Sequence, residues 1–412
     1  MGAVVGALAA TTVGFAPNAA AYDAKSKQWY LAPMEAEQMW KVSTGKGVKV
    51  AVIDSGVNAN TPSLKGQVLT DQVPKSVSYR ATDDYTGHGT TMAELIAGTG
   101  AGGGLQGLAP GAKIVPIRIE LEGLKGGAEE KQKTPNSVAA IKAAADTDVK
   151  IINMAFGAEG PDPDEETAID YAASKGKLLI AAVGNDGEAG GRIDYPAASP
   201  YVVGVAAGDK TGTVSKFSSS GGYVDFTAPG QDFPGWCDAN FRSYCDDRDG
   251  TSPAAAIVSA SAALIWSAHP DWTVNQVTRS LIDTAGRDWP EDEPSKYLGY
   301  GGVRPRVVLE KSTYDPGPAN VDPLAKENGG DLLAKSASSA SSSSTTPAAP
   351  SASASGTSQA PEKASTGGTS AAGSTAEASN ESNTLWIALG AAAAVIVIGG
   401  AGVAIMRARR AR

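Results

Sequence analysis

The sequence has few residues that could build a structural metal site or a disulfide framework. It contains two cysteines and two histidines among 412 residues. A structural zinc site needs four Cys or His ligands at close pairwise spacing, and Cys237, Cys245, His88 and His269 are not arranged in that way. We therefore predict no zinc. A disulfide-rich miniprotein is excluded, whereas one Cys237–Cys245 bridge is compatible with an oxidising compartment.

Positive charge is also scarce outside the last six residues. The chain has 35 Lys and Arg against 44 Asp and Glu, a net charge of −9. The final RARRAR contributes +4, so the rest of the chain carries −13 (−9 minus 4). Because nucleic-acid binding depends on positive charge placed near phosphates, we predict no nucleic-acid partner.

Uncharged apolar runs lie at the two ends of the chain. Residues 3–16 precede a small-residue run at 19–21, which indicates a signal peptide over 1–21; a small buried helix is the alternative. Residues 385–406 are 22 uncharged positions, about 33 Å of helix and long enough to cross a bilayer. The basic tail 407–412 places the C-terminus in the cytoplasm. These features predict a single-pass membrane protein whose remaining part is extracytoplasmic.

Composition divides the rest of the chain. Residues 335–383 are nearly all Ser, Ala, Thr, Gly and Pro, a composition that buries too little apolar surface to fold. We predict a disordered stalk over 313–384 and a globular domain over 46–312. The preceding extension, 22–45, either packs against this domain or occludes its site, and its shortness favours packing.

Within the globular part, short runs rich in Val and Ile alternate with helical patterns. This alternation predicts an α/β fold with a doubly wound, mostly parallel sheet and helices on both faces. The expected strands are 48–53, 112–119, 149–155, 178–183 and 201–206, and the expected helices are 89–98, 135–145, 164–175, 252–268 and 273–285. Ligands of such folds gather at the carboxyl ends of the strands.

Four polar side chains fall at strand ends or helix starts. Asp54 and Asn185 follow strands, His88 stands between two glycines before a helix, and Ser252 begins the helix 252–268. Each has an ordinary structural explanation as a turn former or a helix cap. Taken together, they are the residue types of an acyl-transfer site: an acid, a base, a nucleophile and an oxyanion donor.

Several segments resemble those of subtilisin-like peptidases, in the order of that family. They are VAVIDSGV (50–57), GHGT (87–90), KIINMAFG (150–157), AAVGNDG (181–187), YPAASPYVVGVAA (195–207), FSSSGGYVDFTAPG (217–230) and DGTSPAAA (249–256). The resemblance implies a serine endopeptidase with an Asp, His, Ser triad in that chain order. Ser252 would be the nucleophile, His88 the base and Asp54 the residue that orients it, with Asn185 as an oxyanion donor.

The same resemblance identifies Ala155, Phe156 and Gly157 as the edge that pairs with an extended substrate. It implies no organic cofactor. Members of the family often bind calcium, but the sequence has no dense run of oxygen ligands, so none is predicted. Two positions depart from the family pattern: Pro253 follows the nucleophile, and Ala256 stands where a proline is usual.

A narrower resemblance is to mycosins, the membrane-anchored subtilisin-like proteases associated with type VII secretion. It rests on QWYL (28–31), on AEQMWKVSTGKGVKVAVIDSGV (36–57), on the loop between Cys237 and Cys245, on the stalk and on the single C-terminal span. It implies an extracytoplasmic endopeptidase that cleaves secreted proteins beside a type VII secretion membrane complex. The main alternative is a structural subunit of that complex whose proteolysis is dispensable. A stalked adhesin would have no organised triad.

Overall fold

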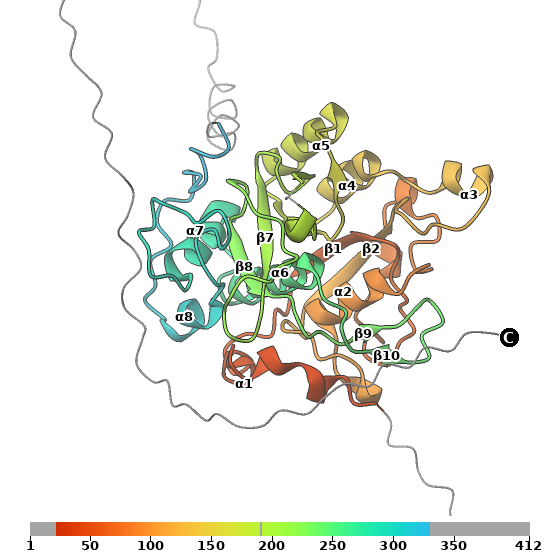
Figure 1. Cartoon of the computed structure of the whole chain (residues 1–412), viewed down its shortest axis with the longest axis horizontal. Helices are drawn as coiled ribbons and strands as arrows, with labels where there is room; N and C mark the ends of the chain where they lie inside the picture. The colour runs from red at the N-terminus through yellow and green to blue at the C-terminus, as the bar shows by residue number, and fades with distance from the viewer. Residues whose placement is uncertain (1–21, 190–191, 330–412) are drawn as a thin grey trace, which may run out of the picture. The chain divides into compact units, whose positions relative to one another are not determined.

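The computed structural model describes residues 22–189 and 192–329, which belong to one compact unit (Figure 1). The predicted signal peptide, membrane span and basic tail lie outside these residues, as does the stalk from 330 onward. Among the described helices, one is long and apolar enough to span a membrane, Thr251–Ala268. Because most of it is buried inside the domain, it is a core helix.

A six-stranded parallel sheet forms the centre of the domain (Figure 1). Its strands lie in the order β2–β1–β3–β5–β7–β8. They are β1 (Lys49–Asp54), β2 (Lys113–Arg118), β3 (Ile151–Met154), β5 (Leu178–Ala182), β7 (Val202–Gly208) and β8 (Phe226–Pro229). The five predicted strands all take part. The sixth, β8, was not predicted, because its four residues end in proline and carry little periodic signal.

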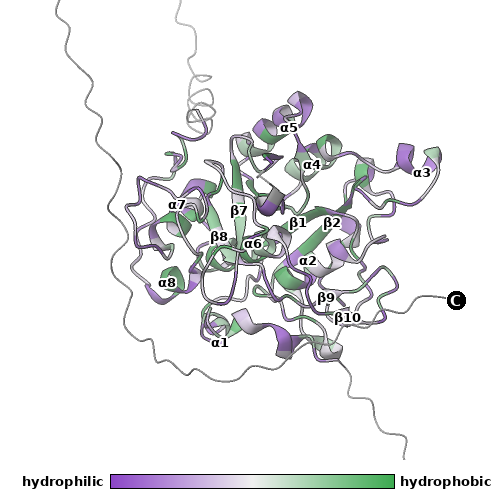
Figure 2. Ribbon diagram, viewed as in Figure 1, coloured by the Kyte–Doolittle hydropathy of each residue, from purple (hydrophilic) through white to green (hydrophobic). Residues whose placement is uncertain are grey.

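Helices cover both faces of the sheet, which confirms the predicted α/β fold. One face carries α2 (His88–Ala97), α6 (Thr251–Ala268), α7 (Val274–Thr284) and α8 (Pro305–Glu310), and the other carries α4 (Ser137–Ala145) and α5 (Pro163–Ser174). Successive strand residues therefore enter different cores: Val50 and Val52 face α6, whereas Ala51 and Ile53 face α4. Figure 2 shows apolar colour on the sheet and on α6, and polar colour on the outer turns of α3 (Ala128–Lys133) and α5.

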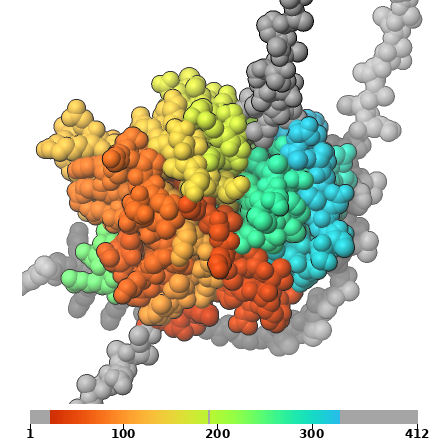
Figure 3. All heavy atoms as spheres, turned by 180° about the vertical axis from the view of Figure 1, so that it is seen from behind, coloured from red at the N-terminus to blue at the C-terminus, as the bar shows by residue number. Residues whose placement is uncertain are grey.

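The N-terminal extension packs against the same core. Tyr30 is fully buried and stacks on Phe233 with ring centroids 4.8 Å apart, and Met39 of α1 (Ala36–Met39) is also buried. Glu35 forms an ion pair with Arg306 of α8, and Figure 3 shows this red segment beside the blue C-terminal part. Among the described residues, no hydrogen bond joins the extension to Asp54, His88 or Ser252. These contacts show that the extension packs against the domain rather than occluding the predicted site.

The folded domain extends past residue 312, where we expected it to end. The Arg279 guanidinium donates hydrogen bonds to the carbonyl groups of Pro316, Pro318 and Val321. Further along, Leu324 is buried, and Tyr300 donates to Glu327 at 2.6 Å. The three prolines of 313–323 are typical of a linker, but the distant Arg279 binds its backbone, so the folded domain continues beyond the predicted boundary.

Candidate active site

A buried carboxylate and an imidazole form the first half of the site. Asp54 ends β1 and is fully buried, while His88 begins α2 with its side chain 40% exposed. The Nδ1 atom of His88 lies 2.9 Å from both oxygens of Asp54. Gly89 permits this approach, because a Cβ there would lie 2.2 Å from the carbonyl oxygen of Gly56. The pair thus forms where α2 rests directly on the end of β1.

A second carboxylate, Asp84, supports this half and was not predicted. It is buried, and it accepts hydrogen bonds from the backbone N–H groups of Thr86, Gly87 and Thr90. The hydroxyls of Ser55 and Thr90 donate to it as well. An Asp just before a helix is a capping signal, so the sequence contained a local hint. Its partners fix the loop that carries His88.

The charges around the imidazole of His88 raise its pKa. Burial disfavours the charged ring, but the charge and hydrogen bond of Asp54, with the charge of Asp84, outweigh burial and the opposing charge of Arg248. The pKa of His88 therefore lies above its ordinary value. Because Nδ1 faces a carboxylate, it carries the proton in the neutral ring, and Nε2 is left as the acceptor.

Ser252 stands at the start of α6 and forms the second half of the site. Its side chain is mostly buried, and its hydroxyl donates to the carbonyl oxygen of Ala155 at 3.2 Å. Among the described residues, no hydrogen bond joins Ser252 to His88. Both nevertheless line one cleft of about 330 Å³ together with Asn185 and Trp236. A rotation of the Ser252 side chain would turn its oxygen from Ala155 toward this cleft.

The Asn185 side chain is oriented by the same helix start. Its Oδ1 accepts hydrogen bonds from the backbone N–H of Thr251 at 2.9 Å and from the Thr251 hydroxyl at 3.2 Å. A backbone N–H can only donate, so the amide oxygen must face it and the NH2 group must point elsewhere. That NH2 group takes part in no hydrogen bond among the described residues, which leaves a donor available beside Ser252.

The structure brings the predicted substrate edge to the same place. Ala155 and Phe156 follow β3, and Gly157 leads into the short strand β4 (Ala158–Glu159). The chain connects β1 to β2 on one side and continues with β3 on the other. Such a reversal of strand order opens a crevice at the carboxyl ends, where ligands bind in open α/β sheets. Asp54 and Ala155 flank this crevice.

The residues that flank the disulfide loop, Trp236 and 247–249, form one wall of the cleft. Cys237 and Cys245 are bonded, and the short strands β9 (Gly235–Trp236) and β10 (Tyr244–Cys245) pair beside them. Trp236 stacks on Tyr244 with centroids 3.9 Å apart, and the Tyr244 hydroxyl donates to Glu94 of α2 at 2.6 Å. Burial raises the pKa of Glu94 to about 7, despite that bond. Trp236 and Glu94 were not predicted, because only tertiary contacts bring them together.

The two departures from the family pattern occupy different environments. Pro253 lines the cleft but lies in the first turn of α6, where a backbone N–H has no intrahelical partner to lose. Ala256 is fully buried among the core residues around α6.

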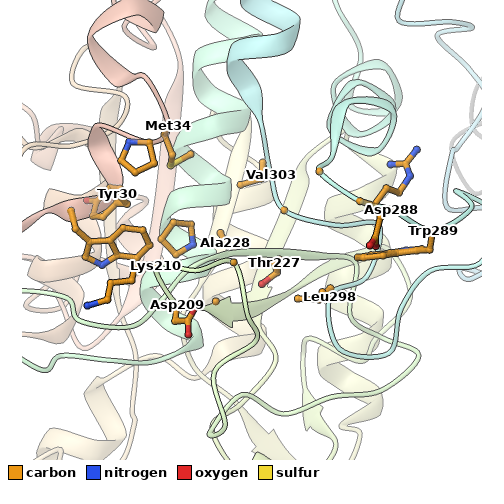
Figure 4. A pocket seen from close by; sticks show the side chains of 18 residues that line it. Tyr30, Met34, Asp209, Lys210, Thr227, Ala228, Asp288, Trp289, Leu298 and Val303 are labelled. Carbon is orange, nitrogen blue, oxygen red and sulfur yellow. The ribbon is translucent and has the colours of Figure 1, made fainter. Parts of the chain in front are cut away.

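A second cavity, of about 540 Å³, lies away from these residues (Figure 4). Its walls come from the N-terminal extension, from the end of β7 and the residues after it (208–212), from β8 and from the segment 286–303. Figure 4 shows Tyr30 and Met34 on one side of it and Trp289 on the other. None of the predicted site residues lines it. Within 22–189 and 192–329, no group of three His, Cys, Asp or Glu side chains is placed to hold a metal ion.

Comparisons with known proteins agree with the resemblance drawn from the sequence. A model of the Subtilase family matches residues 45–301. The minor extracellular protease Epr of Bacillus subtilis is 31% identical over 70% of this chain and 42% of its own length. Subtilisin E of the same species is 33% identical over 59% of this chain and 61% of its own length. The chain thus spans less than two thirds of either relative.

Solved structures give the same result. MycP1 from Mycobacterium smegmatis aligns with a TM-score of 0.59 and 25% identity, covering 74% of this chain and 89% of that chain. The MycP3 protease from the type VII (ESX-3) secretion system aligns with a TM-score of 0.56 and 28% identity, covering 71% and 89%. The predicted similarity to subtilisin-like peptidases and to mycosins is confirmed.

Proposed function

The chain belongs to the subtilase family, and we propose that it is a membrane-anchored serine endopeptidase that acts outside the cytoplasm. One observation supports this function best. His88, paired with the buried Asp54, lines the same cleft as a serine at a helix N-terminus and an amide whose NH2 group has no hydrogen-bond partner among the described residues. These are the parts that acyl transfer requires.

In the proposed reaction, Ser252 Oγ leaves the Ala155 carbonyl, passes its proton to Nε2 of His88 and bonds to the scissile carbonyl carbon. Asp54 holds the Nδ1–H and stabilises the imidazolium. His88 then gives the proton to the leaving amine as the C–N bond breaks. Water hydrolyses the resulting acyl-enzyme by the same steps, and Ser252 regains its proton.

The oxyanion would be bound by two donors. One is the Asn185 NH2 group, which the bonds from Thr251 turn away from the helix backbone. The other is the backbone N–H of Ser252, which lies in the first turn of α6 and has no intrahelical acceptor. The positive end of the α6 dipole favours the same negative charge.

We place this activity at the outer face of a membrane. The signal peptide and C-terminal span expected from the sequence support that location, and the Cys237–Cys245 bond suits an oxidising compartment. The similarity to MycP3, a protease of a type VII secretion system, supports association with such a system and cleavage of secreted proteins. Anchoring would raise the effective concentration of secreted substrates at the enzyme.

The test is covalent labelling of the full-length protein in detergent with a fluorophosphonate, read by intact mass. We expect one adduct, and we expect Ser252→Ala to remove it. Peptide cleavage should fall about 10⁶-fold in the same variant. Ser267→Ala is the matched control, because Ser267 lies at the far end of the same helix and bonds Lys46. It should label like the wild type.

Absence of an adduct on folded protein would contradict the enzyme and favour the structural alternative. Cells then separate the two roles. If secretion stops on deletion of the chain but continues with Ser252→Ala, the protein supports the secretion complex without proteolysis.

A further inference from the structure

The side chain of Glu94 is fully buried close to the cleft, and the proposed reaction does not use it. Glu94 lies on α2, six residues after His88, so it belongs to the helix that carries the proposed base. Its Oε1 accepts a hydrogen bond from the Thr61 hydroxyl at 2.7 Å, and its Oε2 accepts from the Tyr244 hydroxyl at 2.6 Å. A buried carboxyl therefore joins α2 to β10.

Glu94 reaches the cleft through an aromatic pair. Tyr244 is the register partner of Trp236 in the pairing of β9 with β10, and the two rings stack on each other. Trp236 lines the cleft together with His88 and is only 7% exposed. Its indole N–H is buried and faces the Glu94 carboxyl without the geometry of a full hydrogen bond. A displacement of Tyr244 would therefore move the ring that forms the cleft wall.

The hairpin 235–245, formed by β9 and β10, lies on the first turns of α2 (Figure 1). The backbone N–H of Trp236 donates to the Thr91 hydroxyl at 3.0 Å, and this hydroxyl donates to the carbonyl of Gly87 at 2.8 Å. These contacts use backbone and hydroxyl groups, which do not ionise. The bond from Tyr244 to Glu94, in contrast, attaches the hairpin to α2 through a group that can gain or lose a proton.

The partners of Glu94 suit a neutral carboxyl. Thr61 and Tyr244 contribute hydroxyls, which can accept a hydrogen bond as well as donate one, so a protonated carboxyl keeps both partners. Asp84 has the opposite surroundings, because it accepts from three backbone N–H groups, which can only donate. In the described part of the chain, no Lys, Arg or His forms an ion pair with Glu94. Because burial of an unpaired charge is costly, the enclosed position favours the protonated form.

Few other groups near Glu94 change their charge near neutral pH. His88 is the other titratable residue of α2. Tyr244 keeps its proton, because burial and the charge of Glu94 raise its pKa. The adjoining segments 61–64 and 104–106 contain no ionisable side chain. The remaining titratable residues of the hairpin and its surroundings form no hydrogen bond with Glu94 among the described contacts: Tyr22, Asp238, Arg242, Asp246 and Arg248.

We propose that Glu94 is a positioning residue whose protonated carboxyl holds Tyr244 on α2 and thereby keeps Trp236 in the cleft wall beside His88. When Glu94 loses its proton, the buried charge favours a state in which water reaches the carboxylate and the hairpin separates from α2. The inference rests on the proposed peptidase function for its consequence, which is weaker binding of a peptide once the wall is displaced.

Linkage gives the direction and the size of the pH effect. Burial raises the pKa of Glu94 from its ordinary value of 4.5 to about 7. A carboxyl with a raised pKa stabilises the enclosed state fully below its ordinary pKa, and this contribution is lost as pH rises through the raised value. The hairpin should therefore open more readily at higher pH. For this difference in pKa, the opening constant increases roughly 50- to 100-fold between pH 5 and pH 8.

The first test is hydrogen–deuterium exchange of the full-length protein in detergent, read on peptides that span the hairpin and corrected for the pH dependence of chemical exchange. The wild type should show the 50- to 100-fold rise, a result that does not depend on any variant folding. Glu94→Gln cannot ionise and should give the same opening constant at both pH values. Asp246→Asn is the matched control, because this carboxylate lies beside the hairpin and bonds Tyr22. It should keep the pH dependence of the wild type.

The second test separates a positioning role from a purely structural one. We would measure kcat and KM for one peptide from an internally quenched library, with the wild type and with Glu94→Gln. The ratio of the wild-type KM to the variant KM should rise several-fold between pH 5 and pH 8. The acidic limb of kcat, which His88 sets, should coincide in the two proteins. Because both proteins contain His88, its protonation cancels in the KM ratio.

Two results would overturn the inference. One is a wild-type opening constant that does not rise with pH, or a rise that Glu94→Gln retains. The other is a constant KM ratio although the hairpin opens, which would limit Glu94 to a structural role. If fluorophosphonate labels Ser252 in these samples, the peptidase function stands in either case. If it labels no folded protein, the proposed function is wrong, while the exchange measurement still decides whether Glu94 controls the hairpin.

Discussion

The two helices that meet at the site begin in opposite ways. At the start of α2 the backbone N–H groups are already bonded within the chain, because the Asp84 carboxylate accepts from the N–H groups of Gly87 and Thr90. We call this a filled helix start, and a start whose N–H groups lack such an acceptor an open one. Both helices have a glycine at the N-cap and no side chain bonded from that position, but at the start of α6 the only acceptor among the described side chains is Asn185, which takes the N–H of Thr251. A filled helix start fixes the residue beside it, here His88. An open start keeps donors free for an anion, here the oxyanion expected at Ser252.

The largest effect is expected from the open start. Asn185→Ala removes the donor beside Ser252, so peptide kcat should fall about 100- to 1000-fold with little change in KM. The measurement is steady-state cleavage of one peptide by wild type and variant. Asn240→Ala, an exposed amide in the disulfide loop, is the control and should be unaffected. If kcat of Asn185→Ala stays within a few-fold of the wild type, the open helix start does not bind the oxyanion.

Asp84→Asn should remove hydrogen bonds at the filled start of α2. Both oxygens of Asp84 accept hydrogen bonds, so the new NH2 group would face backbone donors. The free energy of unfolding should fall by about 2 kcal/mol, measured by chemical denaturation. Asp83→Asn is the matched control, because that neighbouring carboxylate is half exposed and bonds Arg80 at the surface. Equal stability of the two variants would show that Asp84 does not anchor the loop.

The smallest expected effect is a shift in the pH dependence of kcat/KM. His88 must be neutral to accept a proton, so kcat/KM should rise with pH through the pKa of His88, which lies above its ordinary value. Because the charge of Asp84 contributes to that upward shift, Asp84→Asn should move the acidic limb of the profile to lower pH. Asp83→Asn should leave it in place. A limb that does not move would limit Asp84 to a purely structural role.

The link between His88 and stability has a defined sign. A histidine whose pKa is raised by folding stabilises the domain fully below its unfolded pKa, and this contribution disappears as pH rises through the folded pKa. Activity and this part of stability therefore change in opposite directions across the same pH window. The neutral imidazole needed for catalysis is the form that binds Asp54 less strongly.

Much of the fold and the site could be predicted because the signals are local. Buried strands such as β1 and β5 have continuous apolar runs. Polar residues at or shortly after their ends, such as Asp54 and Asn185, fall at the edge where ligands bind. The glycines around His88 marked a close approach of backbone. Other features left no such signal. The hydrogen bond from Arg279 to the Val321 carbonyl extends the folded domain past the predicted boundary. The stacking of Trp236 on Tyr244 places Trp236 in the cleft wall.

The amino-acid sequence by itself determined the parallel sheet, the chain order of Asp54, His88 and Ser252 and the relationship to subtilases, because strand ends and helix starts depend on neighbouring residues. Only the tertiary structure decided what each carboxylate faces. Asp84 is surrounded by N–H donors, whereas the Asp194 carboxylate lies against Gly157 and Gly184 and accepts no hydrogen bond from the described residues. The energy of a buried charge depends on the groups that folding brings around it, and those groups come from distant parts of the chain.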